Sequence, residues 1–541
     1  MIQKRKKIVL YSPHHVNAGI GQVVTKHYLP LALLQVAGFP VREGYEVILI
    51  DGNVHSIEEG HRMAVEACEG ALLFATTGIL GYQVADGTHC TRKVKQRFPD
   101  LPAFIGGWFA TVEPLLFLET GLYDAVAIGQ GEHTFLDLIH AVEAAEPLDE
   151  IRGLALWRDG EMCFTPPRPI ADWDELPNAP WELLDFEVYR ELQVGEYQRR
   201  VAGALAPPPG YAGGKPFTGI AYLASYGCPQ ACDFCCSPGS YERRWNAMPA
   251  ERMLDDLESL QDRWDFQVAS FFDASFGVDE ERMRAFATGL LDRGMKLFYY
   301  PFFSARSVMR YQPDTIDLLA ESGLYAAVLG AETGSEETME RIHKCTNVEE
   351  NYETVKRFTE RGISTRASYI IGFPGESEES MLETLRQSLR LAVDFPNSAP
   401  TVWPFQPIPG TGLWPEALAA GFVPPESLDE WGEFLHFKLG GFWKDAIPSH
   451  IARLRKLYEH FVTLANGTAR NKYGVWERHA LGRLRDRDGF EKGWPLGRAE
   501  AKAFELYDRV EQRLPSWLTS RGEIERGWKT NRPRSELVSH S

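Results

Sequence analysis

Four of the eight cysteines in this 541-residue chain lie within nine positions, between Cys228 and Cys236. Cys228, Cys232 and Cys235 have the spacing C-x3-C-x2-C within the segment ASYGCPQACDFCCSPGSY. Three thiolates can bind three irons of a [4Fe-4S] cube and leave the fourth iron open to another ligand, whereas an electron-transfer cluster usually takes four thiolates. We therefore predict a cluster with one open coordination position.

A structural zinc site is the alternative for the same cysteines. Zinc usually takes four protein ligands, with a second Cys or His pair at short spacing. No such pair follows, and His343 and Cys345 lie more than a hundred positions away. Cys236 also forms a C-x3-C spacing with Cys232. We keep the cluster on the C-x3-C-x2-C set and expect Cys236 to pack within the loop.

The composition is that of a globular protein, with 44% hydrophobic and 24% charged residues. A formal net charge of −18 argues against bulk nucleic acid as a partner, because phosphate contacts need clustered Lys and Arg. No stretch approaches the roughly 18 uninterrupted apolar residues of a membrane span. The few cysteines elsewhere argue against a disulfide scaffold and for a reducing compartment. We expect a cytoplasmic protein that acts on a small or neutral molecule.

Residues 1–140 alternate strand-like apolar runs with helical stretches, which predicts a doubly wound parallel sheet. The five runs begin at Lys7, Tyr45, Gly70, Leu101 and Tyr123. In such sheets ligands bind outside the carboxyl ends of the strands. The candidate ligand-binding residues at those ends are Asp51, Thr76, Thr77, Gly106, Gly107, Gly129, Gly131 and Glu132.

Residues 141–217 form a predicted connector, and the run APPPGYAGGKP from Ala206 marks its boundary with the next domain. A second α/β alternation fills residues 218–430, with strand candidates that begin at Gly219, Val268, Leu297, Tyr325, Arg366 and Thr401. Six such units predict a partial parallel barrel with its active site at the carboxyl ends of the strands. The cysteine segment directly follows the first of these strands. Residues 431–525 read as helical, and residues 526–541 as a disordered tail.

With Phe234 before its last cysteine, on the first loop of a βα barrel, the C-x3-C-x2-C motif resembles the radical SAM superfamily. The resemblance implies that S-adenosylmethionine (SAM) chelates the open iron and is cleaved to a 5′-deoxyadenosyl radical, which the barrel shields from solvent. It also implies a small-molecule substrate and a reductant such as flavodoxin or ferredoxin.

The same resemblance carries over to SAM-binding positions along the barrel. Asp273, in FFDASFG, matches the second-strand segment, although Asp-Ala replaces the more usual Gly-Gly-Glu or Asp-Asp. Glu332, in GAETGSE, matches the segment near the ribose, where a carboxylate can accept from two hydroxyls. The remaining implied SAM contacts are Phe234, Ser304, Arg306 and Gly372.

The N-terminal sheet resembles the cobalamin-binding domain of the B12-dependent radical SAM class. The segments AFIGGWFAT and AIGQGEHTF are similar to that class's Gly-Gly and Gly-x-Gly-Glu segments. The resemblance implies methyl transfer from methylcobalamin to an unactivated carbon. The sequence has no D-x-H-x-x-G motif, so a corrin with histidine ligation of that form is not expected, and we nominate none of His14, His15 and His89 as a cobalt ligand.

Three alternatives remain open beside methyl transfer. The same cofactors could support an oxidative cyclisation or rearrangement, as in relatives that build the extra ring of chlorophyll, and fold alone does not decide this. Methylthiolation of tRNA predicts three N-terminal cysteines and a basic C-terminal domain, which this acidic chain lacks. A non-catalytic cobalamin sensor leaves the three clustered cysteines unexplained. Lipid, porphyrin, peptide and natural-product substrates all remain open.

Overall fold

The computed structural model of the chain describes residues 6–15, 29–193, 208–211, 217–395, 397–434, 443, 446–455 and 458. Most of the predicted helical region at 431–525 and the whole predicted tail at 526–541 lie outside the described residues, so these two expectations stay predictions. Within the described part, no helix is long and apolar enough to cross a lipid bilayer.

The N-terminal part of the described chain builds a sheet in the strand order β2-β1-β3-β4-β5-β6-β7. The first five strands are parallel: β1 (Lys7–Ser12), β2 (Glu46–Asp51), β3 (Ala71–Thr77), β4 (Ala103–Gly106) and β5 (Ala125–Ala127). The antiparallel hairpin of β6 (Leu154–Arg158) and β7 (Glu161–Phe164) extends this sheet. The start of the predicted connector is therefore part of the N-terminal sheet.

Alternation along β1 explains why helices cover both faces of this sheet. Ile8 and Leu10 pack in one buried cluster, while Val9 and Tyr11 pack in another, because successive side chains of a strand point to opposite faces. The first cluster includes residues of α1 (Leu31–Arg42) and α6 (Glu132–Ala144), and the second includes residues of α2 (Ile57–Ala67) and α3 (Tyr82–Arg97). The carboxyl ends of β1 and β3, where the strand order reverses, are left open for a ligand.

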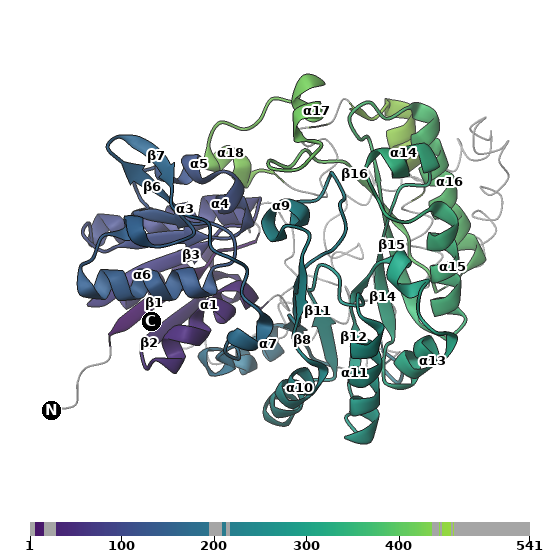
Figure 1. Cartoon of the computed structure of the whole chain (residues 1–541), viewed down its shortest axis with the longest axis horizontal. Coiled ribbons are helices and arrows are strands. Elements are labelled where there is room, and N and C mark those ends of the chain that lie inside the picture. Colours follow the sequence, from purple (N-terminus) through teal and green to yellow (C-terminus); the bar gives the residue numbers. More distant parts are fainter. Residues whose placement is uncertain are drawn as a thin grey trace, which may run out of the picture.

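The second half of the described chain forms an arc of parallel strands in two sheets, ordered β12-β11-β8 and β13-β14-β15-β16 (Figure 1). The strands are β8 (Gly219–Tyr222), β11 (Val268–Phe271), β12 (Phe298–Tyr300), β13 (Phe302–Phe303), β14 (Ala326–Glu332), β15 (Ser364–Ile371) and β16 (Thr401–Pro404). Six of these seven strands begin close to a predicted start, and β13 is the exception. On the outer side of the arc lie α10 (Ala250–Trp264), α11 (Glu280–Asp292), α13 (Pro313–Glu321), α15 (Val348–Thr359) and α16 (Glu378–Asp394).

The third predicted strand is split into β12 and β13 at Pro301. Proline has no N–H to give to a neighbouring strand, so it interrupts the ladder. The Pro301 carbonyl still accepts from Val328 N–H at 3.0 Å, and Tyr299 forms an isolated parallel bridge with Leu324. These contacts make the two sheets one continuous arc.

Aromatic side chains of the connector dock it against the start of the arc. Trp181 stacks on Tyr222 of β8, with ring centroids 5.9 Å apart and an interplanar angle of 11°. Phe186, the first residue of α7 (Phe186–Gln193), stacks on Trp264 of α10 at 4.5 Å and 6°. Stacked pairs of this kind add about 0.5–1.5 kcal/mol beyond the area that they bury. The connector therefore packs against the arc that it leads into.

Candidate active site

The three predicted cluster cysteines lie on one loop at the carboxyl end of β8. We call residues 228–236 the cysteine loop; it lies between the short strand β9 (Ser225–Gly227) and α9 (Ser237–Tyr241). Gly227 has a φ of +73°, and a Cβ there would lie 2.1 Å from the Arg244 carbonyl oxygen. Glycine is therefore required for the turn into Cys228.

The thiols of the cysteine loop influence one another and differ in acidity. Burial raises the pKa of Cys228 above its usual value and the pKa of Cys232 to about 12. A hydrogen bond from the Cys236 thiol lowers the pKa of Cys235 to about 7, with help from Ser237 N–H, which lies 3.4 Å from the Cys235 Sγ. The same contact raises the pKa of Cys236. The Cys236 thiol therefore lies within hydrogen-bonding reach of Cys235, and the choice of Cys228, Cys232 and Cys235 as the cluster ligands stays a prediction.

The donor chemistry of the loop fits an iron–sulfur cluster. In the part of the chain that the structure describes, no three His, Cys, Asp or Glu side chains converge as they would around a single metal ion. The thiolates of a cubane each bind a different iron and do not converge on one point. Cys228, Cys232 and Cys235 are the residues that would hold such a cluster.

A segment a hundred positions further along the chain binds the cysteine loop directly. Asp233 N–H donates to the Ile342 carbonyl at 3.1 Å, and the Asp233 carboxylate lies 2.7 Å from His343 Nδ1. Sequence reasoning noted His343 only as a poor zinc ligand. The structure shows instead that Ile342 and His343 contact the loop, through one backbone hydrogen bond and one exposed contact between the imidazole and the carboxylate.

Glu332, the predicted ribose contact, ends β14 and has a left-handed φ of +61°. Its Oε1 accepts from Lys344 Nζ at 2.9 Å, and both side chains are 10% exposed. Burial lowers the pKa of Lys344, but the charges of Glu332, Cys232 and Cys228 outweigh it and raise that pKa above its usual value. Lys344, which the sequence did not single out, therefore remains a cation beside the cysteine loop.

Asp273 follows β11 and holds the strand that leads into the cysteine loop. Its carboxylate accepts from Ala224 N–H at 3.2 Å and from the Ser225 hydroxyl. Burial raises the pKa of Asp273 to about 6. The structure therefore gives Asp273 a supporting contact with β9, and its predicted contact with SAM stays a prediction.

Two further predicted SAM residues follow β13. Ser304 is buried at the start of α12 (Ala305–Val308). Arg306 donates from Nη1 to the Cys345 carbonyl at 3.2 Å, next to Lys344. Both residues lie at the carboxyl end of the arc. Their predicted contacts with SAM stay predictions.

Phe234 and Gly372 lie near a small cavity at the carboxyl ends of β15 and β16. The cavity has a volume of about 250 Å³ and is lined by Phe234, Ser368, Ile370, Trp403, Pro404, Phe405, Gln406 and Ile408. Gly372 follows β15 with a φ of +85°, and its N–H donates to Glu376 Oε2 at 2.6 Å. Phe234 lies 5.9 Å from the Phe373 ring. An apolar slot of this kind suits a flat aromatic ring.

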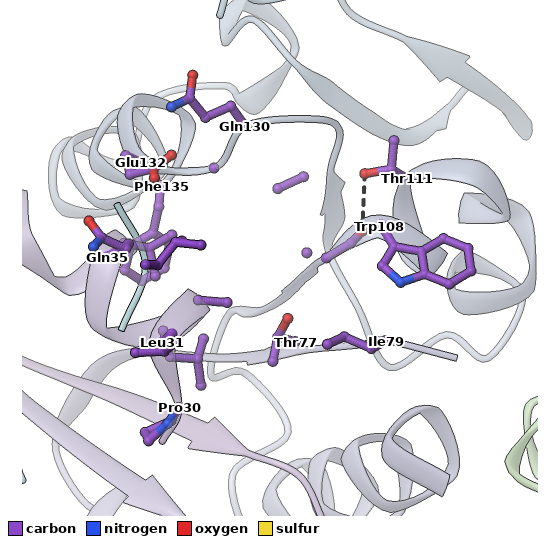
Figure 2. A pocket seen from close by; sticks show the side chains of 18 of the residues that line it. Pro30, Leu31, Gln35, Thr77, Ile79, Trp108, Thr111, Gln130, Glu132 and Phe135 are labelled. Carbon is purple, nitrogen blue, oxygen red and sulfur yellow. Dashed lines mark hydrogen bonds between the residues drawn. The ribbon is translucent and has the colours of Figure 1, made fainter. Parts of the chain in front are cut away.

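A larger cavity of about 460 Å³ lies at the carboxyl ends of β1, β3, β4 and β5 (Figure 2). We call it the interface cavity, because Tyr226, Gly227, Tyr241 and Phe272 from the other half of the chain also line it. The cavity therefore extends from the N-terminal sheet to the strand that enters the cysteine loop. Seven of the eight residues predicted at these strand ends line it: Thr76, Thr77, Gly106, Gly107, Gly129, Gly131 and Glu132.

Asp51 is the predicted residue that does not line the interface cavity. Its carboxylate accepts from the Tyr189 hydroxyl at 2.8 Å and from Asn53, and burial raises its pKa. Its strand, β2, lies at the sheet edge beyond β1, whereas the cavity follows β1, β3, β4 and β5. Asp51 is therefore one strand further from the reversal than the cavity reaches, and its predicted contact with cobalamin stays a prediction.

Thr111, which the sequence did not single out, hydrogen-bonds to both glycine turns of the interface cavity, at Gly107 and at Gly129. Its hydroxyl donates to the Gly107 carbonyl at 3.0 Å, the dashed line in Figure 2. The same oxygen accepts from Gly129 N–H at 3.0 Å. Gly107 has a φ of +99°, and a Cβ there would lie 2.6 Å from the Gly78 carbonyl oxygen. The backbone at this end of the sheet is therefore close-packed and locally cross-linked.

The three histidines noted in the sequence have different surroundings. His14 is buried, and its Nδ1 lies 3.0 Å from the Asp86 carboxylate. His15 lines the interface cavity, and burial lowers its pKa to about 4. His89 pairs with Asp429 on the surface at 2.6 Å.

The sequence of residues 222–387 matches the radical SAM superfamily. The chain is 27% identical over 423 residues to an uncharacterized methyltransferase of Pyrococcus horikoshii, covering 77% of this chain and 84% of that protein. It is 24% identical over 388 residues to an anaerobic magnesium-protoporphyrin IX monomethyl ester cyclase of Synechocystis, covering 71% of this chain and 72% of the cyclase.

Two solved structures share the fold. The radical SAM methyltransferase TsrM of Kitasatospora setae, with cobalamin and a [4Fe-4S] cluster bound, superimposes with a TM-score of 0.61 at 16% identity, over 89% of this chain and 99% of TsrM. OxsB, a cobalamin-dependent SAM radical enzyme with aqua-cobalamin bound, gives 0.58 at 18% identity over 77% of this chain, which spans 56% of OxsB. The cysteine loop at the end of β8, the strands that follow it and the matched sequence agree: residues 222–387 form a radical SAM domain.

Proposed function

We propose that this chain is a radical SAM enzyme that cleaves SAM at a [4Fe-4S] cluster on Cys228, Cys232 and Cys235. We further propose that it binds cobalamin in the interface cavity and methylates an unactivated carbon of a small molecule. One observation carries this proposal. A single cavity has the glycine-rich ends of a parallel sheet as one wall and the strand that enters the cysteine loop as the other.

The proposal includes a finer assignment of the fold. Residues 1–140 would be a Rossmann-like cobalamin-binding domain, residues 141–217 a connector, and residues 218–430 a partial (β/α)6 barrel of TIM type. Supporting this assignment are the strand order 2-1-3-4-5 and the continuous arc from β8 to β16. The volume of the interface cavity, about 460 Å³, falls within the range of organic cofactor sites.

The cluster and SAM would supply a carbon-centred radical, and cobalamin a transferable methyl group. The chain's own residues would bind and orient these groups. The cavity beside Phe234 would take the adenine ring, with the Gly372 turn along its edge. Lys344 donates to Oε1 of Glu332. The ribose hydroxyls would donate to the other carboxylate oxygen of Glu332. Ser304 and Arg306 would contact the polar end of SAM, and Asp273 would hold the cysteine loop.

The lining of the interface cavity would exclude water from the reacting groups. Leu31, Val36, Phe104 and Phe135 are among its apolar side chains. Excluding water prevents the side reactions of a radical and strengthens the electrostatic contacts that orient its partners. The glycine turns at Gly107 and Gly129 would let a large flat ligand approach the backbone.

Anaerobic reconstitution tests the first half of the proposal. Purified protein supplied with iron, sulfide, SAM and either dithionite or a flavodoxin or ferredoxin system is expected to form 5′-deoxyadenosine, and Cys232→Ala is expected to lose cluster iron. Cys163→Ala is the matched control, because that half-buried cysteine lies on β7, outside the cysteine loop. Absence of 5′-deoxyadenosine, together with iron content unchanged in Cys232→Ala, would defeat the proposal.

Cobalt content and the absorbance spectrum of the protein loaded with hydroxocobalamin test the second half. We expect one corrin per chain. A second candidate function, oxidative cyclisation, is favoured by the similarity to the magnesium-protoporphyrin cyclase. The mass of the product separates the two: a gain of one methyl group supports methylation, and a change in hydrogen or oxygen alone supports cyclisation.

A further inference from the structure

One hydrogen bond joins the turn that lines the interface cavity to the strand that enters the cysteine loop. Glu132 is the first residue of α6 and is 4% exposed. Its Oε1 accepts from the Tyr226 hydroxyl at 2.7 Å. Tyr226 belongs to β9 and precedes Cys228 by two positions. The two residues are separated by 94 positions in sequence, and both line the interface cavity.

Other contacts hold β9 from the side of the arc and the connector. Tyr226 pairs with Asn246 of β10 (Trp245–Ala247), and Ser225 donates to Asp273. The Tyr226 ring stacks on Tyr241 at 6.2 Å and 15°, and lies 4.6 Å from the Trp173 ring. Glu132 adds a contact from the N-terminal sheet, which places the turn after β5 directly against β9.

The chemistry of the pair makes this contact stiff. Glu132 is 4% exposed, and the Tyr226 hydroxyl lies 2.7 Å from its Oε1. A hydroxyl that donates to a buried carboxylate forms a short bond, roughly twice as strong as one between neutral groups. A buried carboxylate without this donor would be costly, so the pair resists separation.

We infer that Glu132 and Tyr226 are positioning residues whose hydrogen bond sets the distance between the interface cavity and the cysteine loop. The inference rests on the proposed function, because that distance matters where a radical formed at the loop and a methyl group held in the cavity must meet one substrate. A displacement of about 1 Å in such an arrangement can cost about a hundredfold in rate. The Gly-x-Gly-Glu segment thus has two roles: its glycines line the cavity, and its glutamate reaches β9.

Hydrogen exchange of the full-length protein tests the contact without any bound cofactor. Tyr226→Phe removes the donor, and Glu132→Gln keeps an oxygen that can accept. Tyr189→Phe is the matched control, because the Tyr189 hydroxyl donates to the buried Asp51 at 2.8 Å, away from the loop. We expect exchange of residues 225–236 to rise about tenfold in Tyr226→Phe, to rise less in Glu132→Gln, which keeps a neutral acceptor, and to stay at the wild-type rate in Tyr189→Phe.

Two readouts on protein loaded with cluster and cobalamin then test the positioning role. Pulsed electron paramagnetic resonance measures the distance between the reduced cluster and cob(II)alamin. We expect Tyr226→Phe to broaden or shift this distance and to raise the ratio of 5′-deoxyadenosine to S-adenosylhomocysteine several-fold, and we expect the control Tyr189→Phe to match wild type. An unchanged distance and ratio in Tyr226→Phe would overturn the inference, whatever its exchange rate.

A further variant keeps the test decisive if Tyr226→Phe does not fold. Glu132→Ala then replaces it, with Glu132→Gln as its conservative partner, and wild-type exchange at residues 225–236 in Glu132→Ala would overturn the inference. Failure of the proposed function has a different signature. Wild-type protein would then bind no cobalamin, while the exchange experiment would still decide whether Glu132 holds β9.

Discussion

At the residue scale, Lys344 is a buried cation between the cysteine loop and the end of β14. Its ammonium lies 2.9 Å from Glu332, and the thiols of Cys228 and Cys232 also favour its charged form. A cluster with three thiolates carries negative charge, so a cation at this position stabilises the loop. Removing one partner of a buried ion pair leaves the other without compensation, which is more costly than losing the attraction alone.

We therefore predict that Lys344→Met lowers the free energy of unfolding by about 3 kcal/mol and weakens SAM binding, because Glu332 is left buried and unpaired. Lys344→Arg should lose much less, since it keeps the charge. Urea unfolding and equilibrium binding of SAM measure the two effects. Equal stability of Lys344→Met and wild type would contradict the prediction.

A second group of buried polar residues surrounds Asp86 of α3, which packs against the N-terminal sheet. Its carboxylate accepts from the Tyr11 hydroxyl at 2.8 Å, from His14 Nδ1 at 3.0 Å and from His61 Nε2 at 2.9 Å. Burial raises the pKa of Asp86, but the hydrogen bonds from His14 and His61 outweigh it and hold that pKa below its usual value. Burial lowers the pKa of His14, but its bond to Asp86 and the Asp86 charge bring the pKa above its usual value.

These directions predict how stability depends on pH. The stability from the lowered pKa of Asp86 is present above its unfolded value, about 4, and is lost as the pH falls through the folded value. The stability from the raised pKa of His14 is present below its unfolded value, about 6.5, and is lost as the pH rises through the folded value. The pair should therefore stabilise the fold most between about pH 4 and about pH 6.5.

Asp86→Asn should lower the free energy of unfolding by about 2 kcal/mol within that window and flatten its pH dependence. Urea unfolding from pH 4 to pH 8 measures this. Asp149→Asn is the control, because Asp149 pairs with Arg158 at 2.6 Å and is 41% exposed, and exposed pairs contribute little. An Asp86→Asn profile parallel to wild type would disprove the assignment.

At the element scale, the glycine turns after β4 and β5 depend on a threonine in α4 (Trp108–Val112). Thr111 donates to the Gly107 carbonyl and accepts from Gly129 N–H, each at 3.0 Å. These turns follow two strands that pair in parallel, so their carboxyl ends lie together without further help. The hydroxyl connects the two turns, and Thr111, Gly107 and Gly129 all line the interface cavity.

Thr111→Val should weaken cobalamin binding by up to about thirtyfold, because two hydrogen bonds worth about 1 kcal/mol each are lost. Titration with hydroxocobalamin, followed by absorbance, gives the affinity. Thr120→Val is matched in chemistry: its hydroxyl donates to the Phe117 carbonyl and accepts from Leu122 N–H, outside the cavity. Equal losses in the two variants would mean that Thr111 acts on general stability.

At the scale of the whole molecule, the connector packs the two halves of the chain through aromatic stacking. Phe186 is 3% exposed and lies flat on Trp264. Tyr189, one turn further along α7, donates to Asp51 at the end of β2. One short helix therefore contacts both the arc and the N-terminal sheet. The interface cavity lies between the same two halves, so this packing bears on its shape.

Phe186→Ala should lower the free energy of unfolding by about 3 kcal/mol, because a large buried ring leaves a cavity behind. We also expect calorimetry to resolve separate transitions for the two halves, since the variant weakens their common contact. Phe164→Ala is the control, because Phe164 is 59% exposed. A single transition at the wild-type temperature would contradict this role of α7.

Much of the candidate site could be predicted from the spacing of residue types within short segments of the sequence. The cysteine spacing lies within one loop of nine residues, so Cys228, Cys232 and Cys235 stay on that loop wherever it folds. The strand runs at Gly219, Val268 and Thr401 could be located because buried parallel strands read as continuous apolar segments. Seven of the eight strand-end residues line one cavity for the same reason, since the carboxyl ends of parallel strands meet at one edge.

What only the tertiary structure decided is long-range pairing. Asp51 has the same local pattern as its counterparts on other strands, and the lateral order of the strands alone placed it outside the cavity. Glu132 reaches Tyr226 across 94 positions, and Lys344 comes to the cysteine loop because Ile342 accepts from Asp233. Such contacts depend on how elements pack in space, which no local spacing of residue types encodes. The sequence by itself therefore determined where the strands end and predicted the cluster cysteines, and packing decided what supports them.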